Sequence, residues 1–140
     1  MKFAKIVRNL KELEGIDKFE YLFSLAKKNE GIPNVDKTDI NRIFGCTSTA
    51  YLIVKQYDPV QIITDSESQF VKGLLYILQL YVNDESKEHV LTIDHTYLMD
   101  LMGMENAISS QRTNGFYAAI VKLQKILNNC EDFKNGKKGN

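Results

Sequence analysis

The chain has 140 residues, of which 44% are hydrophobic and 26% are charged, and this composition is typical of an ordinary globular protein. Eighteen basic residues balance eighteen acidic residues, so no excess of positive charge indicates a nucleic-acid partner. The longest apolar run, around residues 74–82, is about half of the ~20 residues that a membrane crossing needs, so no membrane partner is expected.

These bounds predict a single domain over residues 1–140. We expect its core at about residues 3–128 and a flexible tail at 129–140, where the sequence is charged and contains glycine. Residues 1–13 carry charges every few positions and lack the apolar segment of a secretory signal. We therefore expect the cytoplasm, or an equivalent organellar compartment, as the location.

Two helices are predicted at the start of the chain. Apolar residues at positions 3, 6, 7, 10 and 13 keep the 3.6-residue period of an amphipathic helix. Gly15 can end this helix, and Asp17 with Glu20 forms a capping box for a second helix that runs to about Lys28. The polar segment 29–41 contains Gly31 and is predicted to be a surface connection.

A small antiparallel sheet is predicted in the middle of the chain. Residues 50–57 and 60–64 are rich in aromatic and β-branched residues, and Asp58-Pro59 between them is typical of a tight turn. Residues 42–44 are expected to add a short third strand, which the turn-forming residues 45–48 interrupt.

Helices are predicted again after the sheet. Ser66 and Gln69 form a second capping box before residues 70–82, which are apolar on so many sides that this helix is expected at the centre of the fold. Asp94 is expected to cap a short helix that Gly103 ends, and residues 109–114 are expected to form a polar bend before a last helix at 116–127. The predicted fold is α+β, with a short antiparallel three-stranded sheet packed against several helices.

Cys46 is the leading candidate for chemistry. Gly45 precedes it, and the small polar residues Thr47 and Ser48 follow it, so a partner could approach the sulfur. The alternative is a buried cysteine that acts as a small hydrophobic residue. The spacing alone leaves both interpretations open.

Metal binding is not predicted. Cys46, Cys130, His89 and His95 show none of the paired spacings of zinc or iron–sulfur sites, so neither a metal nor another cofactor is expected in this chain. Arg112 could face an anion, a partner carboxylate or the sulfur of Cys46, or be an exposed charge.

The order of four short motifs resembles the SufE family of sulfur acceptors for cysteine desulfurases. The match covers about residues 43–126, most of the chain. The motifs are Gly45-Cys46-Thr47-Ser48, Asp65-Ser66, Phe70-Val71-Lys72-Gly73-Leu74-Leu75 and Arg112-Thr113-Asn114-Gly115. The resemblance implies a SufE/IscU-like fold and a persulfide on Cys46.

The resemblance also implies partners and supporting residues. The sulfur donor would be a SufS-like cysteine desulfurase that uses pyridoxal phosphate, and the recipient a SufBCD-like iron–sulfur scaffold complex. The chain would be a covalent carrier and desulfurase activator rather than a stand-alone enzyme; a homodimer is left open. The supporting or partner-binding residues would be Gly45, Thr47, Ser48, Lys72, Arg112 and Asn114.

Two alternatives share the fold. One is a cluster-assembly scaffold, which would need several cysteine ligands. The other is a non-catalytic interaction module in which Cys46 is structural. For the carrier we expect a mobile loop at about residues 44–49, which opens when the desulfurase docks.

Overall fold

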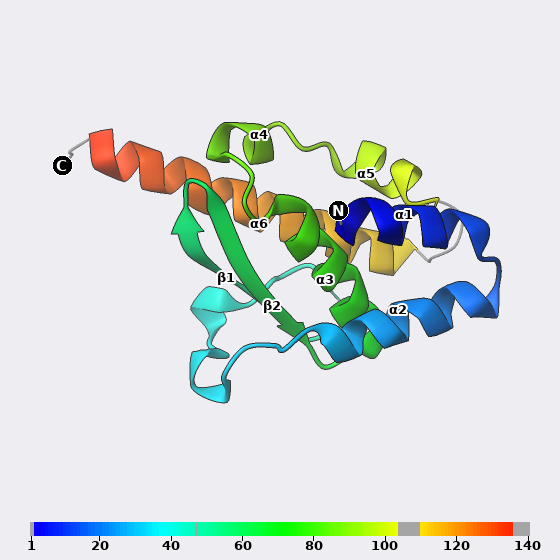
Figure 1. Ribbon diagram of the computed structural model, residues 1–140. Coiled ribbons are helices and arrows are strands. Elements are labelled where there is room, and N and C mark those ends of the chain that lie inside the picture. The colour runs from blue at the N-terminus through cyan, green and yellow to red at the C-terminus, as the bar shows by residue number, and fades with distance from the viewer. Residues whose placement is uncertain (1, 47, 104–109, 136–140) are drawn as a thin grey trace.

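The computed structural model describes residues 2–46, 48–103 and 110–135, and it describes the side chains in these ranges except at 110–114 and 130–135. The elements follow one another along the chain as shown in Figure 1. They are α1 (Lys2–Glu12), α2 (Ile16–Lys28), the short 3₁₀ helices η1 (Asn34–Asp36) and η2 (Asp39–Asn41), β1 (Ala50–Tyr57), β2 (Val60–Ser66), α3 (Gln69–Val82), α4 (Lys87–Leu91), α5 (His95–Leu101) and α6 (Ser110–Asn135).

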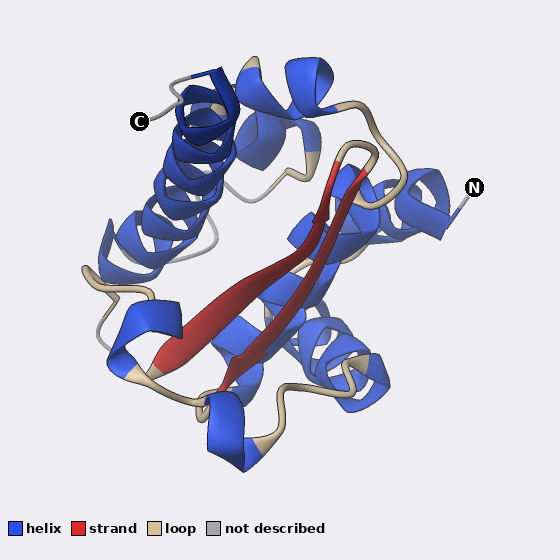
Figure 2. Cartoon of the chain, turned by 90° about the vertical axis from the view of Figure 1, so that its left-hand side faces the viewer, coloured by secondary structure: helices blue, strands red, loops and turns tan. Residues whose placement is uncertain are grey.

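The architecture is α+β, as predicted. Strands β1 and β2 form an antiparallel hairpin whose register runs from Ala50 opposite Ser66 to Tyr57 opposite Val60. Helix α3 packs against β2 and α2, while α6 packs against β1 and α3. In Figure 2 the hairpin crosses the front of the molecule and α6 runs beside it. The apolar side chains of the helices and of one face of the hairpin therefore share one core.

Helix α3 lies at the centre of this core, which confirms the prediction. Leu74, Leu75, Ile77 and Leu78 are all at most 2% exposed. Gly73 lets the helix approach α2 closely, because a Cβ atom at this position would lie 2.3 Å from the backbone oxygen of Leu22. The missing side chain thus fixes how tightly α2 and α3 pack.

The prediction of a third strand is wrong for the described residues, in which the sheet has two strands. Arg42 forms only an isolated antiparallel bridge with Tyr51. The chain leaves η2 at Asn41 and turns at Phe44 and Gly45, so too few extended residues remain between these features to build a strand.

Two predicted helix starts are also wrong. Helix α2 is preceded by Gly15 and has no side-chain cap, so Asp17 does not form the expected box. Helix α3 is capped by Ser68, whose hydroxyl accepts a hydrogen bond from the Val71 N–H, because Ser66 is still the last residue of β2. The hairpin extends further than its apolar pattern indicated.

The predicted polar bend is replaced by helix in the part that the structure describes. Helix α6 already begins at Ser110, so the backbone of residues 110–114 is helical. The same helix continues to Asn135, past the predicted end of the core at residue 128. Both ends are polar and lack the apolar period that located the middle of the helix, but they contain no proline to stop it.

Candidate functional site

The loop that carries Cys46 is held at both ends. Ile43 is 2% exposed, and its N–H donates a hydrogen bond of 2.8 Å to the carbonyl oxygen of Ala50. The carbonyl oxygen of Thr49 accepts hydrogen bonds from the Ser66 hydroxyl and from the Glu67 N–H. The loop that carries Cys46 therefore starts and ends at fixed points beside the hairpin.

Gly45 gives the loop its turn, as the sequence motif suggested. Its φ angle is +95°, a backbone conformation that side chains other than glycine rarely adopt. A Cβ atom at this position would be only in ordinary contact, 3.5 Å from Cβ of Ala118. The requirement for glycine therefore comes from the backbone and not from crowding.

The sulfur of Cys46 lies next to helix α6. A Cβ atom placed on Gly115 would lie 2.9 Å from Sγ of Cys46 and 3.5 Å from its Cβ. Gly115 thus leaves the space that the sulfur occupies. Cys46 is half-buried and packs against the edge of the core, so its side chain is neither fully covered nor fully exposed.

This placement falls between the two interpretations that the sequence left open. The contact with the core resembles that of a small hydrophobic residue, whereas part of the residue's surface stays exposed to solvent. A single thiol in this position can accept or donate one sulfur atom by nucleophilic exchange.

A groove beside Cys46, which we call the Phe44 groove, has a volume of about 570 Å³. Phe44 is 64% exposed, and the guanidinium of Arg42 lies 5.3 Å from the centre of its ring. Nζ of Lys122 donates a hydrogen bond of 2.9 Å to the carbonyl oxygen of Ile40, and burial lowers the pKa of this lysine. The groove is lined by Arg42, Phe44, Gly45, Tyr117, Ala118, Val121, Lys122 and Lys125.

The Phe44 groove combines apolar side chains with positive charge. Tyr117 and Val121 are 47% and 36% exposed, and three of the eight lining residues are cations. No acidic side chain is among these lining residues of the described chain. This composition is complementary to a partner surface that carries an apolar side chain surrounded by carboxylates.

Lys72 has a structural partner. Its Nζ lies 3.4 Å from Oδ1 of Asp65, and Nζ of Lys37 lies 3.2 Å from Oδ2. Asp65 is 6% exposed and accepts hydrogen bonds from the backbone N–H groups of Ile32 and Ser66. The contact given to Lys72 is therefore a buried carboxylate and not the thiol of Cys46.

The environment of Asp65 stabilises its ionised form. Burial alone would raise the pKa of this carboxyl group, but the hydrogen bonds from Ile32 and Ser66 and the ammonium groups of Lys37 and Lys72 outweigh burial and lower it. The carboxylate fastens the chain at Gly31 and Ile32 to the end of β2. Its role at this point is to hold the fold beside the loop base.

The other predicted site residues have different outcomes. Ser48 is half-buried in the loop that carries Cys46. Thr47 lies outside the described residues, and so do the side chains of Arg112 and Asn114, although the backbone of both is in α6. Their supporting roles stay predictions.

Sequence reasoning missed the face of α6 that meets the loop. Gly115, Ala118, Lys122 and Lys125 recur at helical spacing and line either the sulfur or the Phe44 groove. The small residues Gly115 and Ala118, three positions apart, were the available signal for a close approach of another segment.

Two further properties bound what the site can do. Among the described residues, no group of three or more His, Cys, Asp or Glu side chains is arranged to hold a metal ion. None of the described helices is long and apolar enough to cross a membrane.

Comparisons with known proteins agree with this geometry. The SufE family model, described as an Fe-S metabolism associated domain, matches residues 4–127. The cysteine desulfuration protein SufE of Wigglesworthia glossinidia brevipalpis is 26% identical over 135 residues, which cover 92% of this chain and 93% of that protein. An uncharacterised SufE-like protein of Rhizobium meliloti (strain 1021) is 26% identical over 113 residues, which cover 77% of this chain and 81% of that protein.

A solved structure shares the fold. The solution structure of a hypothetical protein from Thermus thermophilus matches with a TM-score of 0.73 at 20% identity, and the match covers 91% of this chain and 94% of that chain. At this identity the likeness shows the fold alone. Because the family model spans most of the sequence and includes both Cys46 and Gly115, the chain belongs to the SufE family.

Proposed function

We propose that this protein is a sulfur acceptor and carrier for iron–sulfur cluster assembly, and that Cys46 carries the sulfur as a persulfide. The observation that supports this role is the position of the Cys46 sulfur. Cys46 is half-buried, its sulfur lies against Gly115 of α6, and the loop that bears it has a fixed base. Membership of the SufE family supports a role in Fe–S metabolism.

The donor in this proposal is a SufS-like cysteine desulfurase, whose pyridoxal phosphate releases sulfur from cysteine onto a cysteine of that enzyme. The Cys46 thiolate attacks the terminal sulfur of the resulting persulfide. A new S–S bond forms on Cys46, the donor's S–S bond breaks, and the donor cysteine leaves as a thiolate, so no external oxidant or reductant is needed. The recipient is an iron–sulfur scaffold complex of the SufBCD type.

Half-burial of Cys46 suits a carrier. The buried part of the residue shields the persulfide from water and from small thiols, while the exposed part admits the donor and the recipient. We propose that the part of the 44–49 loop that carries Cys46 moves outward when the desulfurase docks, while the hydrogen bonds that hold its base at Ile43 and Thr49 stay in place. Such a carrier works in a reducing compartment, where competing disulfides are rare.

The Phe44 groove is the surface that we propose for desulfurase docking. Its exposed Phe44 supplies an apolar anchor next to Cys46, and its cations Arg42, Lys122 and Lys125 would face carboxylates of the enzyme. Docking there would place the donor persulfide beside the loop and stimulate the enzyme by removing its product sulfur.

The proposal is tested by mass spectrometry of the intact protein after incubation with a cysteine desulfurase and cysteine. Wild type should gain the mass of a sulfur atom, and Cys46→Ser should gain none while it keeps the wild-type circular dichroism spectrum. Cys130→Ser is the matched control and should load like wild type. Sulfur loading of Cys46→Ser at the wild-type level would refute the carrier role.

A second experiment tests docking and loop opening. Lys125→Glu should weaken stimulation of the desulfurase, and the effect should shrink at high ionic strength, whereas Lys27→Glu on α2 should leave stimulation unchanged. Alkylation of Cys46 should be faster with the desulfurase whose own reactive cysteine is replaced by alanine than without it. Equal rates in both states would contradict loop opening.

A further inference from the structure

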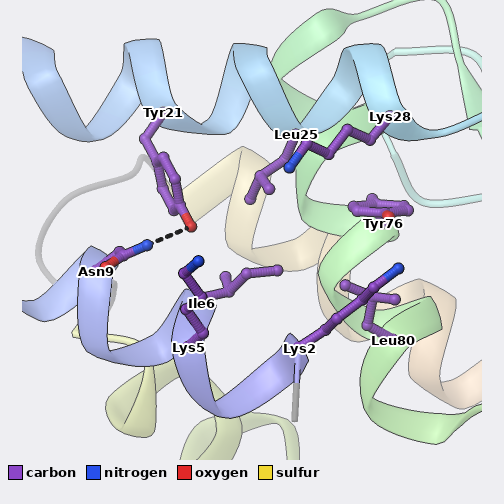
Figure 3. Close-up of a pocket in the computed structure, with 9 residues that line it drawn as sticks. All are labelled: Lys2, Lys5, Ile6, Asn9, Tyr21, Leu25, Lys28, Tyr76 and Leu80. Atoms are coloured by element: carbon purple, nitrogen blue, oxygen red, sulfur yellow. Dashed lines mark hydrogen bonds between the residues drawn. The ribbon is translucent and has the colours of Figure 1, made fainter.

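A second hollow lies between helices α1, α2 and α3, and no residue that lines it belongs to the Phe44 groove. Its volume of about 340 Å³ falls within the range of small-molecule sites. Figure 3 shows side chains from the three helices directed into the space between them. We call this hollow the α1–α2–α3 pocket.

The α1–α2–α3 pocket concentrates positive charge. Lys2 and Lys5 extend from α1 and Lys28 extends from α2, with their amino groups directed toward the space between the helices (Figure 3). No acidic side chain is among the lining residues, and no ion pair of the described residues involves these three lysines. Lys2 also lines an adjoining hollow that contains Asp84 and Glu85, so the excess positive charge comes mainly from Lys5 and Lys28. These lysines around one concave space create a local positive potential that attracts anions.

A fixed hydroxyl group adds to these donors. Nδ2 of Asn9 donates a hydrogen bond of 3.0 Å to the hydroxyl oxygen of Tyr21, which is drawn as a dashed line in Figure 3. Because that oxygen is used as an acceptor, the hydrogen of the Tyr21 hydroxyl is free to be donated to a ligand. The polar edge of the pocket therefore offers donors to a ligand that accepts.

The rest of the lining is apolar or aromatic. Ile6 and Leu25 are buried, and Leu80 and the ring of Tyr76 are half-buried at the α3 side of the pocket. A hydrated inorganic ion would gain nothing from this wall. A small organic molecule could bury its body here while its charged group meets the lysines.

We propose that the α1–α2–α3 pocket binds a small organic phosphate, with the phosphate on the lysines and the organic body on the apolar wall. A phosphate monoester carries close to two negative charges at neutral pH and three acceptor oxygens, which match three ammonium groups and a hydroxyl donor. This binding is independent of sulfur transfer at Cys46.

The test is a titration of the full chain, followed by isothermal calorimetry and by NMR shifts of the backbone amides. The probe is phenyl phosphate, which joins a ring to a phosphate monoester; inorganic phosphate and phenol supply each half alone. Phenyl phosphate should bind saturably and more tightly than either half, and the amide shifts should cluster in α1, α2 and α3.

A matched pair of variants separates a built site from general surface charge. Lys5→Gln with Lys28→Gln should weaken phenyl phosphate binding by about tenfold or more, because two charge-assisted contacts are lost. Arg8→Gln with Lys27→Gln makes the same change in net charge on the same two helices outside the pocket. This control should bind within about twofold of wild type.

Three results would overturn the proposal. The first is the absence of saturable binding of phenyl phosphate to wild type. The second is equal weakening in both double variants, which would indicate a diffuse surface potential. The third is equal affinity for phenol and phenyl phosphate, which would indicate that binding depends on the apolar wall and that the lysines do not contribute. None of these outcomes would bear on whether Cys46 carries sulfur.

Discussion

Gly115→Ala tests the contact between α6 and the Cys46 sulfur. Position 115 lies inside α6, where replacing glycine with alanine should stabilise the helix by about 1 kcal/mol. The new Cβ would lie 2.9 Å from Sγ of Cys46. Carbon atoms make their best contacts at about 3.5 to 4.0 Å, so the sulfur must move outward at a cost of about 1 to 3 kcal/mol.

The two effects can be separated in a Cys46→Ala background. There the sulfur is gone, and the nearest remaining atom, Cβ of residue 46, would be at an ordinary 3.5 Å. Gly115→Ala should then give the full helix gain of about 1 kcal/mol. In the presence of Cys46 it should give no gain or a loss, which predicts a coupling energy of about 1 to 3 kcal/mol between the two positions.

Urea unfolding of the four proteins measures this coupling, and alkylation supplies a second readout. The Cys46 thiol of Gly115→Ala should react faster than that of wild type, because the added methyl group pushes the sulfur toward solvent. If Gly115→Ala changed the free energy of unfolding equally in both backgrounds, to within about 0.3 to 0.5 kcal/mol, the two sites would be independent and the proposed packing would be wrong.

Three further predictions concern the frame around the site. Gly73→Ala should destabilise the protein by about 1 to 3 kcal/mol in urea unfolding, despite its gain in helix propensity, because the new Cβ would lie 2.3 Å from the rigid backbone oxygen of Leu22. A stabilised variant would contradict the close packing of α2 and α3. Asp65→Asn should cost about 1 to 3 kcal/mol at pH 7. The folded pKa of Asp65 is lowered, so the stability from its charge is present above the unfolded pKa of about 3.9 and is lost as the pH falls through the folded value. Urea unfolding at pH 7 and pH 3 should therefore show a smaller acid-induced loss of stability in Asp65→Asn than in wild type. Ser68→Ala should cost about 1 kcal/mol by removing the cap on the Val71 N–H, and the amide exchange rate of Val71 should rise; an unchanged exchange rate would contradict the cap.

The fold was predictable where local pattern and tertiary packing agree. The hairpin has aromatic and β-branched residues on either side of Asp58-Pro59, and α3 has an apolar period that only a central helix can bury. The prediction of a third strand was wrong because strand pairing depends on the path of the chain through η2 and Gly45. The composition of residues 42–44 does not indicate that path.

The site was predictable only in part. Small neighbours in the sequence pointed to Cys46, but its covering residue, Gly115, lies far along the chain and is brought to it by α6 packing on β1. Lys72 was expected at the site because it lies in one of the motifs that resemble the SufE family. The folded chain gives it Asp65, and no local pattern distinguishes a carboxylate partner from a thiol.

The anchored base of the Cys46 loop sets the working range of the sulfur. Ile43 is buried and donates a hydrogen bond to Ala50, so in the proposed opening only three residues would straighten for Cys46 to move away from α6. Three extended residues span about 10 Å, which is long enough to enter a recessed active site of another protein. If Cys46 carries sulfur as proposed, this short reach would limit delivery to partners that bind directly beside the loop.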